Sequence, residues 1–254
     1  MNDNDICLIS SVNNDDIFKS CLARSPDVVS GRLKLTIIRN SVSMSEAYNR
    51  ALDQTENRYA VLAHQDVYLP QGWLDLAKAK LTALDRSHPD WMVAGPYGVQ
   101  ADGRHVGRVW DVGLDRELGA AGFPPTPIVS LDELLLVLRR DNPFRFDPDL
   151  PHFHLYGTDL VQSALCTGRS AWALEMPVVH NSQLVASLSG GYTLAYRYAC
   201  RKWKQRLPIP TTVVPVTRNP IPLLFAKWRL RNRPERAGKL LADAVAIARR
   251  AGYE

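Results

Sequence analysis

The sequence predicts an α/β fold in which a mostly parallel sheet is flanked by helices. Short apolar runs rich in β-branched residues, with polar residues at their ends, indicate four buried strands. These runs span residues 6–12, 33–39, 59–64 and 91–96. Helical patterns separate several of the runs, and an alternation of strand and helix is typical of a parallel sheet covered on both faces. With 254 residues, the chain can bury a sizeable core.

Two segments between the predicted strands have the spacing of helices. In the first, SMSEAYNRAL, Ser43 and Glu46 stand three residues apart, as in a capping box. The second has an apolar residue on each turn, at Trp73, Ala77, Leu81 and Leu84. Because ligands of such sheets bind at the carboxyl ends of the strands, residues 10–13, 39–45 and 64–67 are expected around one crevice.

The pattern is less regular after residue 97. Residues 98–127 contain many Gly and Pro without a clear period, and are predicted to form irregular loops or a hairpin beside the substrate. Residues 131–140 fit a helix and a strand equally. A helix is predicted over residues 159–168, ended by a glycine, and a strand over residues 170–179 that leads to His180.

Charge is unevenly distributed along the chain. Residues 196–254 contain 14 Lys and Arg against 3 Asp and Glu, a net +11, whereas the first 195 residues carry a net −6. We therefore expect a body at residues 1–190 and a basic, Pro-containing, partly helical extension at residues 191–254 that meets an anionic partner. The run YRYACRKWKQR mixes cations with aromatic residues, which fits nucleic acid, a membrane interface or a solvated helix face.

Several classes of protein are not indicated. The N-terminus lacks the pattern of a secretory signal, and the densest apolar run is too short to cross a bilayer. The four cysteines show no CxxC or zinc spacing, which is expected of reduced thiols in a cytoplasmic protein. GxGxxG, Walker A and GxSxG motifs are missing, which argues against dinucleotide oxidoreductases, P-loop enzymes and serine hydrolases.

Carboxylates and imidazoles stand at the ends of the predicted elements. Asp66 follows the third strand, where it either holds a divalent cation against a diphosphate or caps a turn. Asp159 lies in the first turn of a helix, where the helix dipole favours the ionised form. It is therefore either a general base or a stabilising charge. His152, His154 and His180 are candidate metal ligands, although a lone histidine more often has a structural role.

Six segments, in order, resemble the bacterial glycosyltransferase-like proteins related to glycosyltransferase family two, in the group whose metal motif reads HQDV. The segments are ICLISSVNN, IIRNSVSMSEAYNRAL, YAVLAHQDVYLPQGWLD, VSLDELLLVLRR, FDPDLPHFHLYGTDLVQSALCTG and PVVHNS. The resemblance covers residues 5–183. It implies the GT-A fold, a Rossmann-like sheet that binds a nucleoside-diphosphate sugar and transfers the sugar to an acceptor hydroxyl.

The resemblance also implies roles for particular residues. Donor binding is expected of Ser10, Ser11, Asn13, Asn40, Ser45, Asn49, Gln65, Asp66 and Asp132. Asp66 corresponds to the last acid of the family's DxD motif, while His64 and Gln65 replace the earlier acid. His180 would complete the metal site, and Asp159 would act as the catalytic base of an inverting transfer. His64, His152 and His154 are expected to line the acceptor side.

An imidazole ligand would favour Mn²⁺ over Mg²⁺, which prefers oxygen ligands. The acceptor expected is a saccharide, a lipid-linked or a small-molecule hydroxyl, in the synthesis of surface polysaccharide or glycolipid. We expect a cytoplasmic protein that contacts an anionic membrane through residues 196–254, and no nucleic acid. Two alternatives stay open. The incomplete acidic motif favours a non-catalytic binding protein of the same fold, and a sugar nucleotidyltransferase would share the nucleotide crevice.

Overall fold

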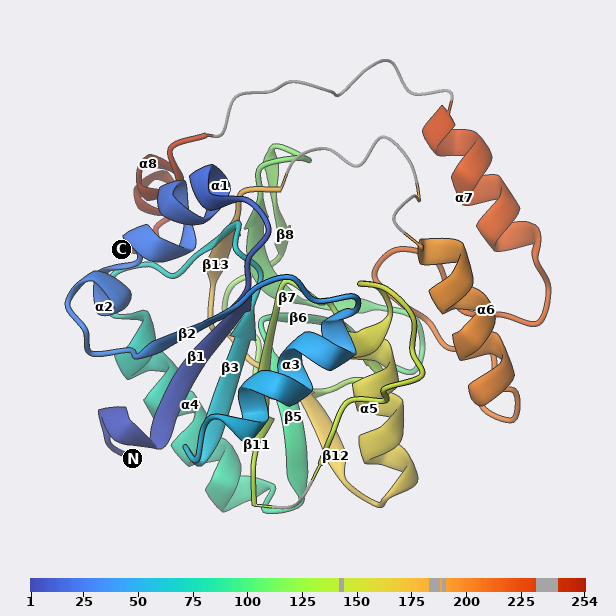
Figure 1. Ribbon diagram of the computed structural model, residues 1–254, viewed down its shortest axis with the longest axis horizontal. Coiled ribbons are helices and arrows are strands. Elements are labelled where there is room, and N and C mark those ends of the chain that lie inside the picture. The colour runs from blue at the N-terminus through green and yellow to red at the C-terminus, as the bar shows by residue number, and fades with distance from the viewer. Residues whose placement is uncertain (142–143, 183–187, 189–190, 232–241) are drawn as a thin grey trace.

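The computed structural model describes residues 1–141, 144–182, 188, 191–231 and 242–254, and it confirms the predicted α/β fold (Figure 1). A seven-stranded sheet forms its centre. The strand order is β2 (Leu35–Ile38), β1 (Ile6–Ser11), β3 (Tyr59–Ala63), β11 (Leu135–Arg139), β5 (Trp91–Gly95), β12 (Ser170–Ala173) and β9 (Thr126–Pro127). All of these strands run in one direction except β11 and β9, which pair antiparallel to their neighbours.

Helices cover both faces of this sheet (Figure 1). The cluster on one face includes residues of α3 (Met44–Asp53) and α5 (Tyr156–Cys166). The cluster on the other face includes residues of α1 (Asp15–Ser20) and α4 (Trp73–Ser87), with α2 (Pro26–Val29) packed at its margin. Two short 3-10 helices, η1 (Asp3–Asp5) and η2 (Leu22–Arg24), flank β1 and α1.

The alternation of side chains along a strand produces these two clusters. In β1, Ile6 and Leu8 lie in the α4 cluster, whereas Cys7 and Ile9 lie in the α3 cluster. Because β1 is buried on both faces, it appears in the sequence as one continuous apolar run.

The predicted start of α3 is confirmed, since the Ser43 hydroxyl accepts a hydrogen bond from the Glu46 N–H at 3.1 Å.

A second sheet stands beside the first. Its order is β10 (Ser130–Leu131), β6 (Tyr97–Val99), β7 (His105–Asp111), β13 (Val178–His180) and β4 (Val67–Tyr68), with β8 (Arg116–Gly119) paired to β7. Strands β6, β7 and β8 pair antiparallel in succession, so the hairpin predicted within residues 98–127 is confirmed. Residues 131–140 contain a strand, β11, because β3 and β5 both supply it with partners.

The prediction of one strand over residues 170–179 was wrong. The segment divides into β12 in the first sheet and β13 in the second. Pro177 lies in the break, and a proline has no backbone N–H to continue a ladder of hydrogen bonds. The break carries His180 from the first sheet to the second.

Helices α6 (Tyr192–Lys202), α7 (Ile221–Arg231) and α8 (Ala244–Arg250) lie in the basic extension. Tyr192 and Ala195 of α6 belong to the cluster that holds α3 and α5. Ala244 and Ile247 of α8 pack with residues of the second sheet. The extension therefore shares hydrophobic cores with the body. In the described part of the chain, none of the helices has both the length and the apolarity that a bilayer crossing requires.

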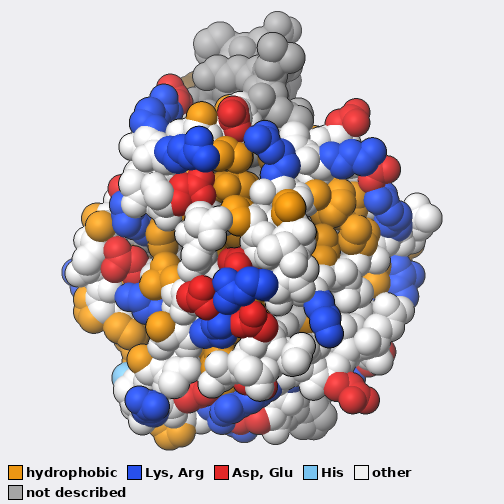
Figure 2. All heavy atoms as spheres, turned by 90° about the vertical axis from the view of Figure 1, so that its left-hand side faces the viewer, with side chains coloured by type: hydrophobic (Ala, Val, Ile, Leu, Met, Phe, Trp, Pro, Cys, Tyr) orange, Lys and Arg blue, Asp and Glu red, His pale blue; other side chains and the backbone are white. Residues whose placement is uncertain are grey.

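The molecular face opposite α7 carries charges of both signs side by side (Figure 2). The largest ion-pair group on the α2–α4 side joins Arg32 to Asp3, Asp27 and Asp75. Such mixed charge is ordinary for a solvated surface.

Candidate active site

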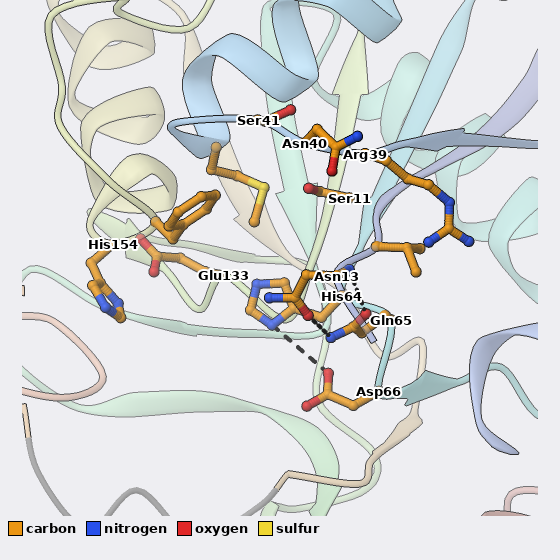
Figure 3. A pocket seen from close by; sticks show the side chains of 13 residues that line it. Ser11, Asn13, Arg39, Asn40, Ser41, His64, Gln65, Asp66, Glu133 and His154 are labelled. Carbon is orange, nitrogen blue, oxygen red and sulfur yellow. Dashed lines mark hydrogen bonds and ion pairs between the residues drawn. The ribbon is translucent and has the colours of Figure 1, made fainter. Parts of the chain in front are cut away.

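A cavity of about 500 Å³ opens at the carboxyl ends of β1, β2 and β3, where the sequence predicts a crevice (Figure 3). Seven of the predicted site residues line it, namely Ser11, Asn13, Asn40, His64, Gln65, Asp66 and His154. They are joined by Arg39, Ser41, Met44, Glu133 and Phe153. Parallel strands end at the same edge of a sheet, which explains why residues so distant in sequence meet here.

Gln65 connects two loops at the rim of this cavity. Its Oε1 accepts hydrogen bonds from the N–H groups of Asn13 and Asn14, both at 3.0 Å. Its Nε2 donates to Asn13 Oδ1 at 2.6 Å (Figure 3). These bonds hold the loop after β1 against the loop after β3, so the polar groups at the rim have defined positions.

Three potential metal ligands meet at one point. A ligand atom from each of His64, Asp66 and His180 lies within 4.8 Å of the other two. His64 Nδ1 is 4.0 Å from Asp66 Oδ1, and His180 Nε2 is 3.5 Å from Asp66 Oδ2. His64 and Asp66 follow β3, whereas His180 ends β13, so the site joins the two sheets.

The hydrogen bonds around His64 determine which of its ring nitrogens carries the proton. Tyr156 donates its only hydroxyl proton to the Glu133 carbonyl at 2.9 Å. Because this hydroxyl also lies 2.7 Å from His64 Nε2, it must accept a proton from that nitrogen. The lone pair of His64 is therefore on Nδ1, the atom that faces Asp66. Burial lowers the pKa of His64, which favours this neutral form.

A second hydrogen-bond chain orients His180. Its Nδ1 lies 3.1 Å from Asp111 Oδ2, so the ring donates to that carboxylate and turns Nε2 toward Asp66. Asp111 is itself held by the Ser182 hydroxyl at 3.0 Å and the Leu114 N–H at 2.8 Å. A carboxylate behind a histidine is the usual way in which proteins fix a metal-binding imidazole.

The charges of Asp66 and His180 shift each other's pKa. Burial would raise the pKa of Asp66, but the charge of His180 and its hydrogen bond outweigh burial and hold that pKa at about 2. Burial acts to lower the pKa of His180, yet Asp66 and Asp111 together raise it well above its usual value. Asp66 Oδ1 is buried and has no hydrogen-bond partner among the described residues. A buried carboxylate oxygen without a partner is costly, and a bound cation would satisfy it.

This donor set fits a divalent transition metal. Two imidazole nitrogens and one carboxylate oxygen suit Mn²⁺, Fe²⁺ or Zn²⁺ better than Mg²⁺, which prefers oxygen donors. His64 Nδ1 and His180 Nε2 already face Asp66 because Tyr156 and Asp111 hold the other nitrogen of each ring, and His180 would release its Nε2 proton when a metal binds. The residues therefore fit a metal ion without a change in rotamer.

Glu133 lines the same cavity and was missed by the sequence analysis. Its Oε1 accepts the Gly157 N–H at 3.2 Å, at the start of α5. Burial, with the neighbouring charge of Asp132, raises the pKa of Glu133 well above its usual value. The side chain therefore keeps its proton to a higher pH than an exposed glutamate, and in the protonated form it can donate a hydrogen bond into the cavity.

Asp159 lies on α5 but is not among the residues that line the cavity. Its Oδ1 accepts the indole N–H of Trp203 at 2.8 Å, and Lys202 donates to Oδ2 at 2.9 Å. Burial raises its pKa, although Lys202 and Trp203 act in the opposite direction. Asp159 thus sits in a buried ion pair that joins α5 to α6.

Six further predicted site residues also lie outside the cavity lining, and one of them is the metal-cluster residue His180. The hydroxyls of Ser10 and Ser45 are buried without a hydrogen-bond partner in the described part of the chain. Asn49 pairs with the backbone of Phe146 through both ends of its amide. The remaining two are Asp132, whose Oδ1 accepts the Leu134 N–H, and His152, whose carbonyl accepts the Met44 N–H.

Three residues that shape the site were not identified from sequence. Asp111 ends the alternating run HVGRVWD, and this alternation could have indicated a strand with a carboxylate at its end. Glu133 directly follows Asp132, the residue to which the family resemblance assigns donor binding. Tyr156 offers no such signal, because only the fold brings its hydroxyl to His64.

Residues 7–77 match the glycosyltransferase-like family. The chain is 32% identical over 148 residues to "ATP synthase subunits region ORF 6" of Fuscovulum blasticum, which is 55% of this chain and 57% of that protein. The chain therefore spans little more than half the length of this relative.

Two solved structures have some similarity to this chain. The mannosyltransferase PcManGT from Pyrobaculum calidifontis, in complex with GDP-Man and Mn²⁺, is 14% identical with a TM-score of 0.46, over 97% of this chain and 73% of that chain. TarS 1-349 of S. aureus, in complex with UDP-GlcNAc, is 15% identical with a TM-score of 0.48, over 80% of this chain and 66% of that chain. The matched residues 7–77 include β1, β2, β3 and Asp66. Over this segment the chain matches the glycosyltransferase-like family, as its motifs predict.

Proposed function

We propose that this chain is a glycosyltransferase that moves a sugar from a nucleoside-diphosphate sugar to an acceptor hydroxyl, with a divalent metal at His64, Asp66 and His180. The observation that carries this proposal is the His–Asp–His cluster at the edge of a polar cavity. Its support is the match of residues 7–77 to the glycosyltransferase-like family. We assign the reaction to residues 1–190, with residues 191–254 as a supporting extension.

A metal ion bound here would neutralise negative charge on the departing diphosphate. The chain's own residues have separate tasks. Ser11, Asn13 and Asn40 offer hydroxyl and amide groups to the nucleotide along the cavity wall. Arg39 places a cation on the same wall, although Asp15 pairs with it in this structure. Mn²⁺ is proposed over Mg²⁺ because two of the three donor atoms are imidazole nitrogens.

Asp159 is proposed to be the general base of an inverting transfer. Burial raises its pKa, which makes its carboxylate a stronger proton acceptor. Lys202 and Trp203 fix the orientation of the carboxylate. Asp159→Asn should lower turnover by about 10²–10⁴-fold and leave nucleotide affinity unchanged. Wild-type turnover in this variant would remove Asp159 from the mechanism.

The acceptor is proposed to be a saccharide, a lipid-linked or a small-molecule hydroxyl, in surface polysaccharide or glycolipid synthesis. The location proposed is the cytoplasm, at the inner face of an anionic membrane. The basic extension supports the membrane contact, because anionic lipids attract clustered cations. The four cysteines are free thiols, as expected in a reducing compartment.

The test is a thermal-shift screen of UDP, GDP, dTDP and CDP, each with and without Mn²⁺. One nucleotide should stabilise the protein, and only with the metal present. Asp66→Asn and His180→Ala should abolish that shift, whereas Asp102→Asn, which changes an exposed carboxylate at a hairpin, should retain it.

Two results would redirect the proposal. Nucleotide binding without sugar transfer to any acceptor or to water would indicate a non-catalytic binding protein. Formation of a sugar nucleotide from a nucleoside triphosphate would indicate a nucleotidyltransferase. If none of the four nucleotides binds to a well-folded sample, the donor site proposed here is wrong.

A further inference from the structure

Helix α7 presents an apolar stripe to solvent. The largest exposed apolar side chains of this helix are Ile221, Leu224, Phe225 and Trp228, which are 63%, 60%, 56% and 59% exposed. Their spacing of three, one and three residues places them within an arc of about 100° on a helix. The Phe225 and Trp228 rings stack with centroids 5.8 Å apart. Isolated apolar side chains on a surface are normal, but a contiguous stripe of four indicates a binding face.

The opposite side of α7 is what attaches it to the protein. Leu223 points roughly half a turn away from the stripe and belongs to the core cluster shared by α3, α5 and α6. The Lys227 ammonium donates to the Thr193 hydroxyl near the start of α6. The helix is therefore fixed by one apolar face, while the described residues leave a second apolar face exposed. In Figure 1 it lies at the outer edge of the molecule, beside α6.

An apolar groove continues the stripe. It encloses about 280 Å³ and is lined by Val213, Val214 and Pro215 on one side and by Pro222, Phe225 and Ala226 of α7 on the other. Val213 is itself 61% exposed. Phe225 thus belongs to both the stripe and the groove, so the two form one surface. A groove of this kind can receive a methylene chain, because it offers apolar walls along its length.

The segment that carries this surface has charged residues of one sign only. Residues 191–231 contain nine Lys and Arg and no Asp or Glu. Arg218, which precedes α7, and Arg229, which borders the stripe and lines the groove, are both exposed. Aromatic and leucine side chains on one face, with cations beside them, are typical of helices that lie in the interface of an anionic bilayer. A protein partner would need an acidic, apolar face, whereas an anionic lipid surface supplies both features at once.

We propose that α7 inserts Ile221, Leu224, Phe225 and Trp228 into the surface of an anionic bilayer while the neighbouring cations contact lipid headgroups. This deepens the membrane contact that is part of the proposed function, by assigning it to one helix face. It does not depend on sugar transfer.

The test is sedimentation of the full chain with vesicles of phosphatidylcholine alone and with vesicles of phosphatidylcholine and phosphatidylglycerol in equal parts. The protein should bind the anionic vesicles and not the neutral ones. Phe225→Glu should weaken that binding by about 10–100-fold, because it removes an aromatic side chain that the bilayer would bury and adds a charge that anionic lipid repels. Arg229→Gln should weaken it by about fivefold, and only on anionic vesicles.

Val29→Glu is the matched control, because Val29 is a 71% exposed apolar residue on α2, at the opposite side of the molecule. It should bind vesicles as the wild type does.

A second experiment uses tryptophan fluorescence. Brominated lipid should quench the fluorescence of exposed Trp228, and Trp228→Phe should remove that part of the quenching. Because Phe225 is exposed, Phe225→Glu should have the same Tm as the wild type and should keep any thermal shift that a nucleotide causes. A failure of sugar transfer would therefore leave this test intact.

The proposal is overturned if Phe225→Glu and Val29→Glu bind anionic vesicles equally, or if no vesicles sediment the wild type. A different outcome is that the wild type binds no vesicles but forms a concentration-dependent dimer. If Phe225→Glu disrupts that dimer, the surface binds a second copy of the chain.

Discussion

At the scale of single residues, His180 is the most constrained side chain of the candidate site. Asp66, Asp111 and His64 face it, and the two carboxylates raise its pKa well above the usual value despite the opposing effect of burial. In the metal-free protein His180 is therefore protonated at pH 6.5. This ion-paired histidine stabilises the fold at low pH, and that contribution is lost as the pH rises through the pKa of folded His180.

This charge state leads to a prediction about the pH dependence of metal binding. A metal ion can bind His180 Nε2 only after its proton leaves, so Mn²⁺ affinity should rise by about tenfold per pH unit below that pKa and then level off. Titration calorimetry between pH 6 and 9 would measure the slope. His105→Ala, a change at an exposed histidine, should leave the slope intact, whereas a flat profile in the wild type would show that His180 is not a ligand.

Glu133 supports a prediction about protonation. Because burial raises the pKa of its carboxyl group, we expect Glu133 to act in the protonated form, and Glu133→Gln preserves both an acceptor for the Gly157 N–H and a donor toward the cavity. This variant should retain stability and nucleotide affinity within about threefold. Glu133→Ala leaves the Gly157 N–H without its partner and should cost about 1–3 kcal/mol of unfolding free energy. Chemical denaturation and nucleotide titration would compare them, and equal damage from both changes would mean that an ionised Glu133 is required.

At the scale of elements, the start of α5 is held against the loop before β11 by a close approach at Gly157. A Cβ atom there would lie 2.8 Å from the Leu131 carbonyl oxygen and 3.1 Å from Glu133 Cγ. A glycine is needed because no side chain fits this space. The approach brings both Tyr156 and Glu133 to the cavity, so the helix start sets the site geometry.

Gly157→Ala should therefore destabilise the protein by about 1–3 kcal/mol, because backbone must move to admit the methyl group. The sign of this change in unfolding free energy tests the close approach, since alanine in an unhindered helix would stabilise the protein by about 1 kcal/mol relative to glycine. Urea denaturation would measure the change, with Ser163→Ala on the same helix as the control. A stabilised Gly157→Ala protein would show that the approach is looser than described.

At the scale of the whole molecule, the metal cluster connects the two sheets. His64 and Asp66 follow β3 of the first sheet, and His180 ends β13 of the second. A ligand that binds only the folded protein stabilises it by about 2.7 kcal/mol at a hundredfold excess over its dissociation constant. At this chain length, that stabilisation corresponds to a rise in Tm of about 5–10 °C.

Mn²⁺ should accordingly raise the Tm of the wild type by about this amount, and a chelator should reverse the rise. Differential scanning calorimetry would measure it. His180→Ala should lose the effect, while Asp102→Asn, far from the cluster, should keep it. A Tm that Mn²⁺ leaves unchanged in the wild type would contradict a metal site between the sheets.

The sequence by itself determined the buried strands β1, β3 and β5, the helices α3, α4 and α5, and the crevice with Asp66 at the carboxyl edge. It also located β2, although the prediction that this strand is buried was wrong, because β2 lies at the edge of the sheet and only Ile38 is buried. These features depend on local apolar runs, helical spacing and capping residues, which a linear chain displays directly. The family resemblance carried His180 to the same site, and the structure places it beside Asp66.

Only the tertiary structure decided the remainder. Whether residues 131–140 form a helix or a strand depended on the partners β3 and β5, and Pro177 split one apolar run between two sheets. The sequence likewise could not show that Asp111 and Tyr156 fix the proton positions of two imidazoles, or that α7 exposes an apolar stripe. These facts follow from contacts between residues distant along the chain, and no local pattern encodes which distant groups will meet.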